Sequence, residues 1–110
     1  MYAPMIGNVV ADPQLKFLDT GTATCSFTVA VKEKRGEEEY TSFFDCTAWG
    51  SLAQNVADSI HKGDRVVLAG KPKQRSYTDK DGNKRSAVEF QIEGIGHDLR
   101  WQTSITTKNQ

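Results

Sequence analysis

The chain has 110 residues, 37% of them hydrophobic and 25% charged, and its 14 basic and 14 acidic side chains leave a formal net charge of zero. That length suits one domain with a compact core, and the charge balance excludes a histone-like protein that binds nucleic acid through bulk electrostatics. A locally basic surface stays open, because the sum does not give the distribution. No apolar run is long enough for a membrane span and the N-terminus does not resemble a secretion signal, so a cytoplasmic protein is expected.

Five strands are predicted along the chain. The first lies near residues 6–11 and continues through residues 15–18. The other four alternate apolar and polar side chains, which is typical of strands with one buried face. Their expected core-facing residues are Cys25, Phe27, Val29 and Val31 in residues 24–32, Phe44, Cys46 and Ala48 in residues 40–49, Val66, Leu68 and Gly70 in residues 65–71, and Val88, Phe90 and Ile92 in residues 86–94.

One helix is predicted between the third and fourth strands, over about residues 52–61. Ser51 and Gln54 have the spacing of a capping box at its start, and Gly63 supplies a left-handed stop after its end. Its expected buried stripe is Leu52, Val56 and Ile60, which recur at helical spacing.

The connections are also predicted: a turn at residues 19–21, a charged loop at residues 33–39 and a hairpin turn at residues 81–83. The order of three strands, one helix and two strands is that of an OB-fold, a five-stranded Greek-key barrel in the all-β class. We therefore expect residues 1–110 to form a single OB-fold domain, with its core at about residues 2–99.

The motifs along the chain resemble those of bacterial single-stranded DNA-binding proteins. The resemblance covers about residues 2 to 100 in register and is carried by Ile6-Gly7-Asn8, Asp12-Pro13, Phe27-Thr28-Val29-Ala30, Trp49-Gly50, Lys62-Gly63-Asp64 and the segment from Tyr77 to Arg85. It implies binding of single-stranded DNA with little sequence preference, in replication, recombination and repair, in the bacterial cytosol or nucleoid. It also implies a homo-oligomer, usually a tetramer built as a dimer of dimers.

Three aromatic residues correspond to positions where the family stacks bases. Tyr77 and Phe43 stand where the family keeps stacking tryptophans, and Trp49 stands where it commonly has a stacking phenylalanine. A fourth expected aromatic is replaced by Arg35 or its neighbours, although a guanidinium can also lie on a base. The residues agree independently, because Phe43 and Trp49 have the parity opposite to the core-facing residues of their strand, and exposed aromatics need a flat cover. The alternative for both is packing beneath a loop or at a subunit interface.

Positive charge gathers between residues 70 and 90. Lys71, Lys73 and Arg75 alternate along the predicted fourth strand and share parity with Tyr77, which places a base platform at the end of a cationic row. We therefore expect this hairpin to lie along single-stranded DNA. The expected phosphate contacts are Lys32, Lys34, Arg35, Lys71, Lys73, Arg75, Lys80, Lys84 and Arg85.

An extra strand is predicted at residues 100–107, followed by a tail at residues 108–110. Trp101, Thr103 and Ile105 share one face of that strand, and the chain there resembles actinobacterial family members, which use such a segment as an inter-subunit clamp. The alternative is a frayed tail with one docked indole. Family members usually continue into a flexible linker and an acidic tip that recruits repair enzymes, and residues 107–110 contain neither. We expect an actinobacterial or phage-like member of the family without the acidic tail, with a trimmed chain, a phage protein and a specialised paralogue as the open explanations.

The sequence contains no catalytic constellation, no metal-ligand spacing and no phosphate-binding glycine loop. We therefore expect no enzyme, no metal, no cofactor and no small-molecule or membrane partner. Cys25 and Cys46 are expected to be buried thiols, with a disulfide between them as the alternative. The alternative function is that of an OB-fold protein-interaction module of the primosome-accessory type, whose aromatic residues contact protein.

Overall fold

A computed structural model describes residues 2–109, within which it contains six strands and one helix. In chain order these are β1 (Ala3–Val9), β2 (Gln14–Phe17), β3 (Ala23–Arg35), β4 (Glu38–Trp49), α1 (Ser51–Ser59), β5 (Arg65–Thr78) and β6 (Lys84–His97). β1 and β2 are the two parts of the predicted first strand. The predicted order of elements, with the helix between the third and fourth strands, is therefore confirmed.

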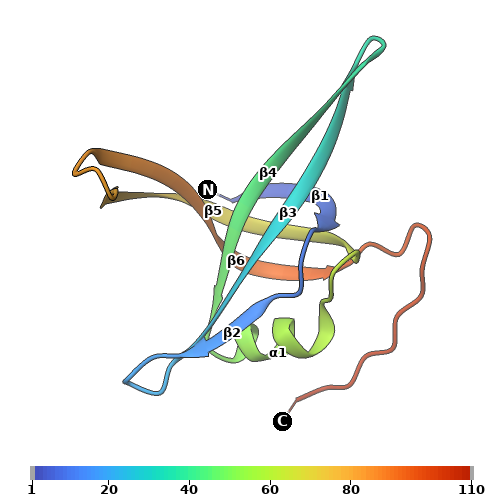
Figure 1. Ribbon diagram of the computed structural model, residues 1–110. Coiled ribbons are helices and arrows are strands. Elements are labelled where there is room, and N and C mark those ends of the chain that lie inside the picture. Colours follow the sequence, from blue (N-terminus) through green and yellow to red (C-terminus); the bar gives the residue numbers. More distant parts are fainter. Residues whose placement is uncertain (1, 110) are drawn as a thin grey trace.

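The strands form one sheet that closes on itself. Their order is β1-β5-β6-β4-β3-β2, and β1 also pairs with β3 through Asn8–Ala30 and Val9–Val29. The pairs are antiparallel except for a short parallel contact between β4 and β6. α1 lies below the barrel, close to β2 (Figure 1). A closed barrel of this order with one helix is the predicted OB-fold.

The core fills the space between the closed sheet and α1. Its buried residues are Val9, Ala23, Cys25, Phe27, Val29, Cys46, Ala48, Ala53, Val56, Ile60, Val66, Leu68 and Ile92. β1 passes so close to β3 that a Cβ on Gly7 would lie 2.6 Å from both the Ala30 carbonyl oxygen and Val29 Cγ1. Only a glycine allows this approach, so Gly7 is a requirement of barrel closure.

The two cysteines are buried and unbonded to each other. Burial, together with the nearby charges of Asp45 and Glu89, raises the pKa of the Cys46 thiol to about 12. Burial also raises the pKa of Cys25. Both side chains are therefore neutral thiols that pack as small apolar groups.

Two hairpins project from the barrel (Figure 1). In the β3–β4 arm, residues 31–42, cross-strand pairing continues to Lys34–Glu39 and Arg35–Glu38. The charged loop predicted at residues 33–39 is therefore wrong, because opposite charges face each other across the ladder and only residues 36–37 form the turn. The β5–β6 arm, residues 71–91, pairs to Thr78–Lys84. With both arms, the radius of gyration is 15.4 Å, against about 13 Å for a compact domain of this length.

α1 differs from the predicted helix at both ends. It begins at Ser51 with Gly50 as its N-cap, at a φ of 68°, and no side chain caps it, so the predicted capping box of Ser51 and Gln54 is not formed. The Gly50 amide instead donates to the Ala23 carbonyl, 2.8 Å away, which fixes the end of β4 to β3. The helix ends before Ile60, whose extended backbone carries its side chain into the core.

Val88 was expected in the core, but its side chain is 55% exposed. β6 begins in the arm and enters the barrel only after Val88, so the face that points into the core at Ile92 points to solvent at Val88. The predicted alternation of side chains along β6 is correct, but in the arm it continues where there is no core to bury the inward face.

Candidate nucleic-acid interface

The pairing of the strands places most of the predicted contact residues on one outer face of the sheet. Directly paired residues in a sheet point to the same side. Ala30 of β3 pairs with Phe43 of β4, and Asp45, on the same face of β4, pairs with Glu89 of β6, which pairs in turn with Lys73 of β5. This outer face therefore runs unbroken across β3, β4, β6 and β5 and continues onto both arms.

Three aromatic rings lie exposed on the outer face. The side chains of Phe43, Trp49 and Tyr77 are 67%, 44% and 47% exposed. The next residue, Phe44, points the other way and packs edge-on against Phe90, with 5.3 Å between the ring centroids. Of the two adjacent phenylalanines, Phe43 is therefore exposed to solvent and Phe44 packs against the protein.

A row of basic residues leads along β5 to Tyr77. Lys71, Lys73 and Arg75 alternate on the outer face, opposite Gln91, Glu89 and Ala87 of β6. Arg75 Nη1 lies 3.9 Å from Glu89 Oε2, so part of its charge is compensated. 

On β3 the outer face carries Lys32 and Lys34 but not Arg35. Lys32 and Lys34 pair with outer-face residues of β4, whereas Arg35 pairs with Glu38 on the opposite side. There the Arg35 guanidinium carbon lies 5.8 Å from the centroid of the Tyr40 ring. Arg35 was grouped with Lys32 and Lys34 because residues 33–39 were assigned to a loop, in which side chains have no fixed parity. In the strand that is found instead, the Arg35 side chain points away from the outer face.

The tip of the β5–β6 arm is organised by Asp79. Its Oδ1 accepts the backbone amides of Asp81 and Asn83 at 3.0 and 2.9 Å, and its Oδ2 accepts Arg85 Nε at 2.9 Å. The Arg85 hydrogen bond and the amide bonds hold the pKa of Asp79 below its ordinary value of 3.8. Arg85 is directly opposite Tyr77 on the ladder, so the ion pair with Asp79 holds a side chain that lies next to the Tyr77 ring. The same ion pair engages the Arg85 guanidinium, which is one of the predicted phosphate contacts.

The two remaining predicted phosphate contacts in this arm lie elsewhere than on the outer face. Lys84 pairs with Thr78, which points to the side opposite Tyr77, and Lys80 lies in the turn itself. Both lysines are exposed at the tip, so they are within reach of a strand that passes around the arm rather than across its face.

Tyr2 is an outer-face aromatic that the sequence analysis missed. Its ring is 51% exposed, and Lys71 Nζ lies 5.0 Å from the ring centroid. Its parity with Ile6, an outward residue of β1, is the signal that could have identified it.

Residues 100–107 form no strand within the part of the chain that the structure describes, contrary to prediction. A strand needs a pairing partner, and here the Gln102 side-chain amide instead donates to the carbonyls of Arg65 and Asp98 at 3.0 and 2.6 Å. Trp101 is 69% exposed, with the guanidinium carbons of Arg65 and Arg100 at 5.0 and 4.7 Å from its ring. The clamp role of Trp101, Thr103 and Ile105 requires a second subunit and stays a prediction.

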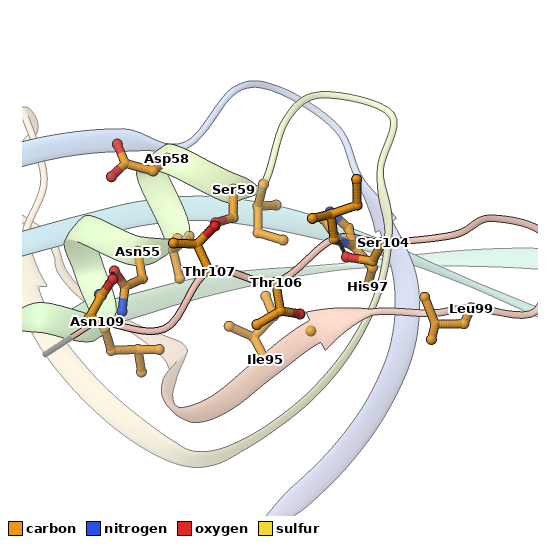
Figure 2. A pocket seen from close by; sticks show the side chains of 15 residues that line it. Asn55, Asp58, Ser59, Ile95, His97, Leu99, Ser104, Thr106, Thr107 and Asn109 are labelled. Carbon is orange, nitrogen blue, oxygen red and sulfur yellow. Dashed lines mark hydrogen bonds between the residues drawn. The ribbon is translucent and has the colours of Figure 1, made fainter.

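A groove of about 660 Å³ lies between α1, the end of β6 and the C-terminal residues (Figure 2). Asn109 Nδ2 donates to Asn55 Oδ1 at 2.7 Å, and Ser104 Oγ lies 3.4 Å from His97 Nδ1, so the C-terminal residues follow the helix. Ile105, which lines this groove, is 98% exposed. None of the predicted base-stacking or phosphate-contacting residues lines it, and the groove is separate from the outer face.

The model of the single-strand binding protein family matches residues 3–98. The chain belongs to this family. The single-stranded DNA-binding protein of Mycolicibacterium smegmatis is 36% identical to it over 94% of this chain and 67% of its own length, and that of Mycobacterium leprae is 38% identical over 94% and 66%. Single-stranded DNA-binding protein 2 of Streptomyces coelicolor is 36% identical over 94% of this chain and 56% of its own length.

The family model and these relatives confirm the predicted family, and the three relatives come from actinobacteria. This family member spans between about half and about two thirds of the length of the curated relatives that it matches. Membership in a family of binding proteins also agrees with the expectation that the chain is not an enzyme. Within residues 2–109, no helix has the length and apolar character needed to cross a membrane.

Proposed function

We propose that this chain binds single-stranded DNA with little sequence preference and covers strands exposed during replication, recombination and repair. The observation that carries the proposal is the gathering of Phe43, Trp49 and Tyr77, all exposed, on one outer face together with alternating lysines. Aromatic rings stack on bases of any sequence, and lysines neutralise phosphates. The names of the actinobacterial relatives support the same function.

Binding follows from two physical terms. Each stacked base contributes about 1 to 3 kcal/mol. Phosphates that approach Lys32, Lys34, Lys71 and Lys73 release their counterions, which favours binding at low salt. Since the outer face continues onto both arms, one strand can contact the rings on β4 and the ring near the tip of the β5–β6 arm together.

Self-association of the chain is part of the proposal, as a homo-oligomer with a tetramer built as a dimer of dimers. From Ala3 to Gly7, β1 pairs only with β5 among the described residues, which leaves an open strand edge. Beside it, the paired side chains of Ile6 and Val67 are 48% and 41% exposed. A second copy would cover both the edge and the apolar pair. In the oligomer, Trp101, Thr103 and Ile105 would act as the clamp. The protein would work in the bacterial cytosol or nucleoid, where exposed single strands arise.

Fluorescence of Trp49 tests the proposal. The chain has two tryptophans, so Trp101→Phe leaves Trp49 as the single reporter. Titration with oligo(dT) should strongly quench its emission, and the logarithm of the binding constant should fall with that of the salt concentration with a slope of about −3, from four lysines. The matched variant Trp49→Phe, which reports through Trp101, should show little quenching.

Unchanged Trp49 emission at low salt would contradict DNA binding and favour the alternative, a protein-interaction module. Light scattering with and without oligo(dT) tests the oligomer separately. A monomer in both conditions would remove the self-association part of the proposal and leave the DNA-binding part in place.

A further inference from the structure

A carboxylate lies in the middle of the outer face, where a polyanion is expected to bind. Asp45 is exposed on β4, on the same side as Phe43 and Trp49. It is two residues from Phe43, so the two Cα atoms are about 7 Å apart along the strand. Its Oδ1 accepts a hydrogen bond of 3.1 Å from Thr28 Oγ1 on the neighbouring strand. The side chain is therefore oriented by the protein.

Asp45 also lacks the charge compensation that its neighbour has. Glu89, directly opposite on β6, has Arg75 at 3.9 Å and Lys73 as its partner on β5. Among the ion pairs of residues 2–109, none involves Asp45. Like charges directly opposite each other are destabilising in a sheet, so the Asp45 charge is a cost to the fold and to phosphate binding alike.

A carboxylate at this place excludes phosphates and leaves its second oxygen, Oδ2, available as a hydrogen-bond acceptor. Because Phe43 and Asp45 are two residues apart on the same face of β4, an edge of a base stacked on the Phe43 ring can approach the Asp45 carboxylate. Cytosine and adenine present an exocyclic amino group, which is a donor to a carboxylate, whereas thymine presents the acceptor O4 at the corresponding position of its ring. Two acceptors that face each other repel, so the two pyrimidines are distinguished although they stack alike.

We infer that Asp45 is a specificity-determining residue that favours a base with an amino group at the position of thymine O4, namely cytosine or adenine, over thymine at the Phe43 platform. The inference rests on the proposed binding of single-stranded DNA and adds a graded base preference to it. The Thr28 hydrogen bond positions the acceptor, Phe43 positions the base, and the lysines at the margins of the face hold the phosphates away from the carboxylate.

Asp45→Asn tests the inference with little change of shape. The asparagine Oδ1 can still accept from Thr28, while its amide group donates and so accommodates thymine O4. Affinities of the unmodified protein and the variant are measured for labelled (dC) and (dT) oligonucleotides of about ten nucleotides, the size of one OB-fold site. The ratio of the two dissociation constants should move toward thymine by about five-fold or more in the variant.

Glu39→Gln is the matched control, because Glu39 is another acidic residue of the outer face, opposite Lys34. It should strengthen binding of both oligonucleotides equally and leave their ratio unchanged. In a Phe43→Ala background, Asp45→Asn should no longer change the ratio. Asp45→Ser, which shortens the acceptor, should lose the cytosine preference too and replaces the asparagine variant if that variant does not fold.

An unchanged ratio in Asp45→Asn, or an equal gain for both oligonucleotides, would overturn the inference, because Asp45 would then act only as a negative charge. Failure of the unmodified protein to bind either oligonucleotide would be a different result, since it would remove the proposed function itself.

Discussion

Two adjacent phenylalanines give a test that separates binding from folding within one strand. Phe43 is 67% exposed on the outer face, whereas Phe44 is partly buried and packs against Phe90. Phe43→Ala removes a ring that is mostly in solvent, so we expect the free energy of unfolding to fall by less than about 1 kcal/mol, the range of strand propensity at a surface site. Phe44→Ala leaves a partly filled space, and a Phe→Ala change of this kind should cost about 2 kcal/mol or more.

The order of the two variants should reverse for DNA binding. Phe43→Ala removes one stacked base and should weaken binding of a short oligonucleotide by about 1 to 3 kcal/mol, or about 5- to 150-fold. Phe44→Ala should bind close to normally at temperatures where it is folded. Urea denaturation gives the first quantity and quenching of Trp49 the second, with light scattering to establish that both variants keep the same oligomeric state.

Equal destabilisation by the two substitutions would refute this reasoning, because it would mean that Phe43 is covered by protein. A change of oligomeric state in Phe43→Ala alone would place that ring at a subunit interface. Normal affinity in a folded Phe43→Ala of unchanged assembly would show that the ring does not stack on DNA.

Three further outcomes follow from the same structure. Tyr77→Ala should weaken oligonucleotide binding by about 1 to 3 kcal/mol in a competition assay without shifting the urea midpoint, and wild-type affinity would exclude stacking there. Lys73→Ala should lower the steepness with which the logarithm of the binding constant falls with that of the salt concentration by about 0.7. Arg85→Ala should lower it less, since the Arg85 guanidinium is engaged by Asp79 at 2.9 Å. Equal reductions for the two variants, in titrations at several salt concentrations, would contradict this assignment. The Cys46 thiol, buried and with a pKa of about 12, should react with an aromatic disulfide reagent at pH 8 only in urea, and fast labelling of the folded protein would show that the core is open.

The core of the barrel could be predicted because its strands follow strict alternation. Val29, Cys46 and Val66 are each fully buried, and each stands at an apolar position flanked by outward-facing neighbours. A single buried face imposes this period of two, so the pattern alone identifies the face. The same parity argument placed Phe43 and Trp49 on the outer face.

The arms could not be predicted as well, because their strands have no core behind them. A run of charged residues such as 33–39 has the composition of a loop, and only the cross-strand pairing of Arg35 with Glu38 reveals a ladder. The same ladder places Arg35 on the side of the arm opposite Lys34, and its phosphate contact stays a prediction. Tyr2 and Asp45 were missed for another reason: the partners that give them meaning, Lys71 and Thr28, are distant in sequence and adjacent only across the sheet.

The two arms give the protein an uneven stiffness. Beyond the barrel, the amides near Tyr77 are held only by the opposite strand, with no third strand or helix behind them. Such a ladder opens and bends at a much lower free energy than the closed barrel to which Trp49 belongs, and its amides exchange with solvent hydrogen sooner. A DNA strand on the outer face therefore meets Trp49 on the rigid barrel and Tyr77 on the flexible β5–β6 arm. Bending of this arm accommodates irregular spacing between bases, so one protein surface can fit many DNA sequences.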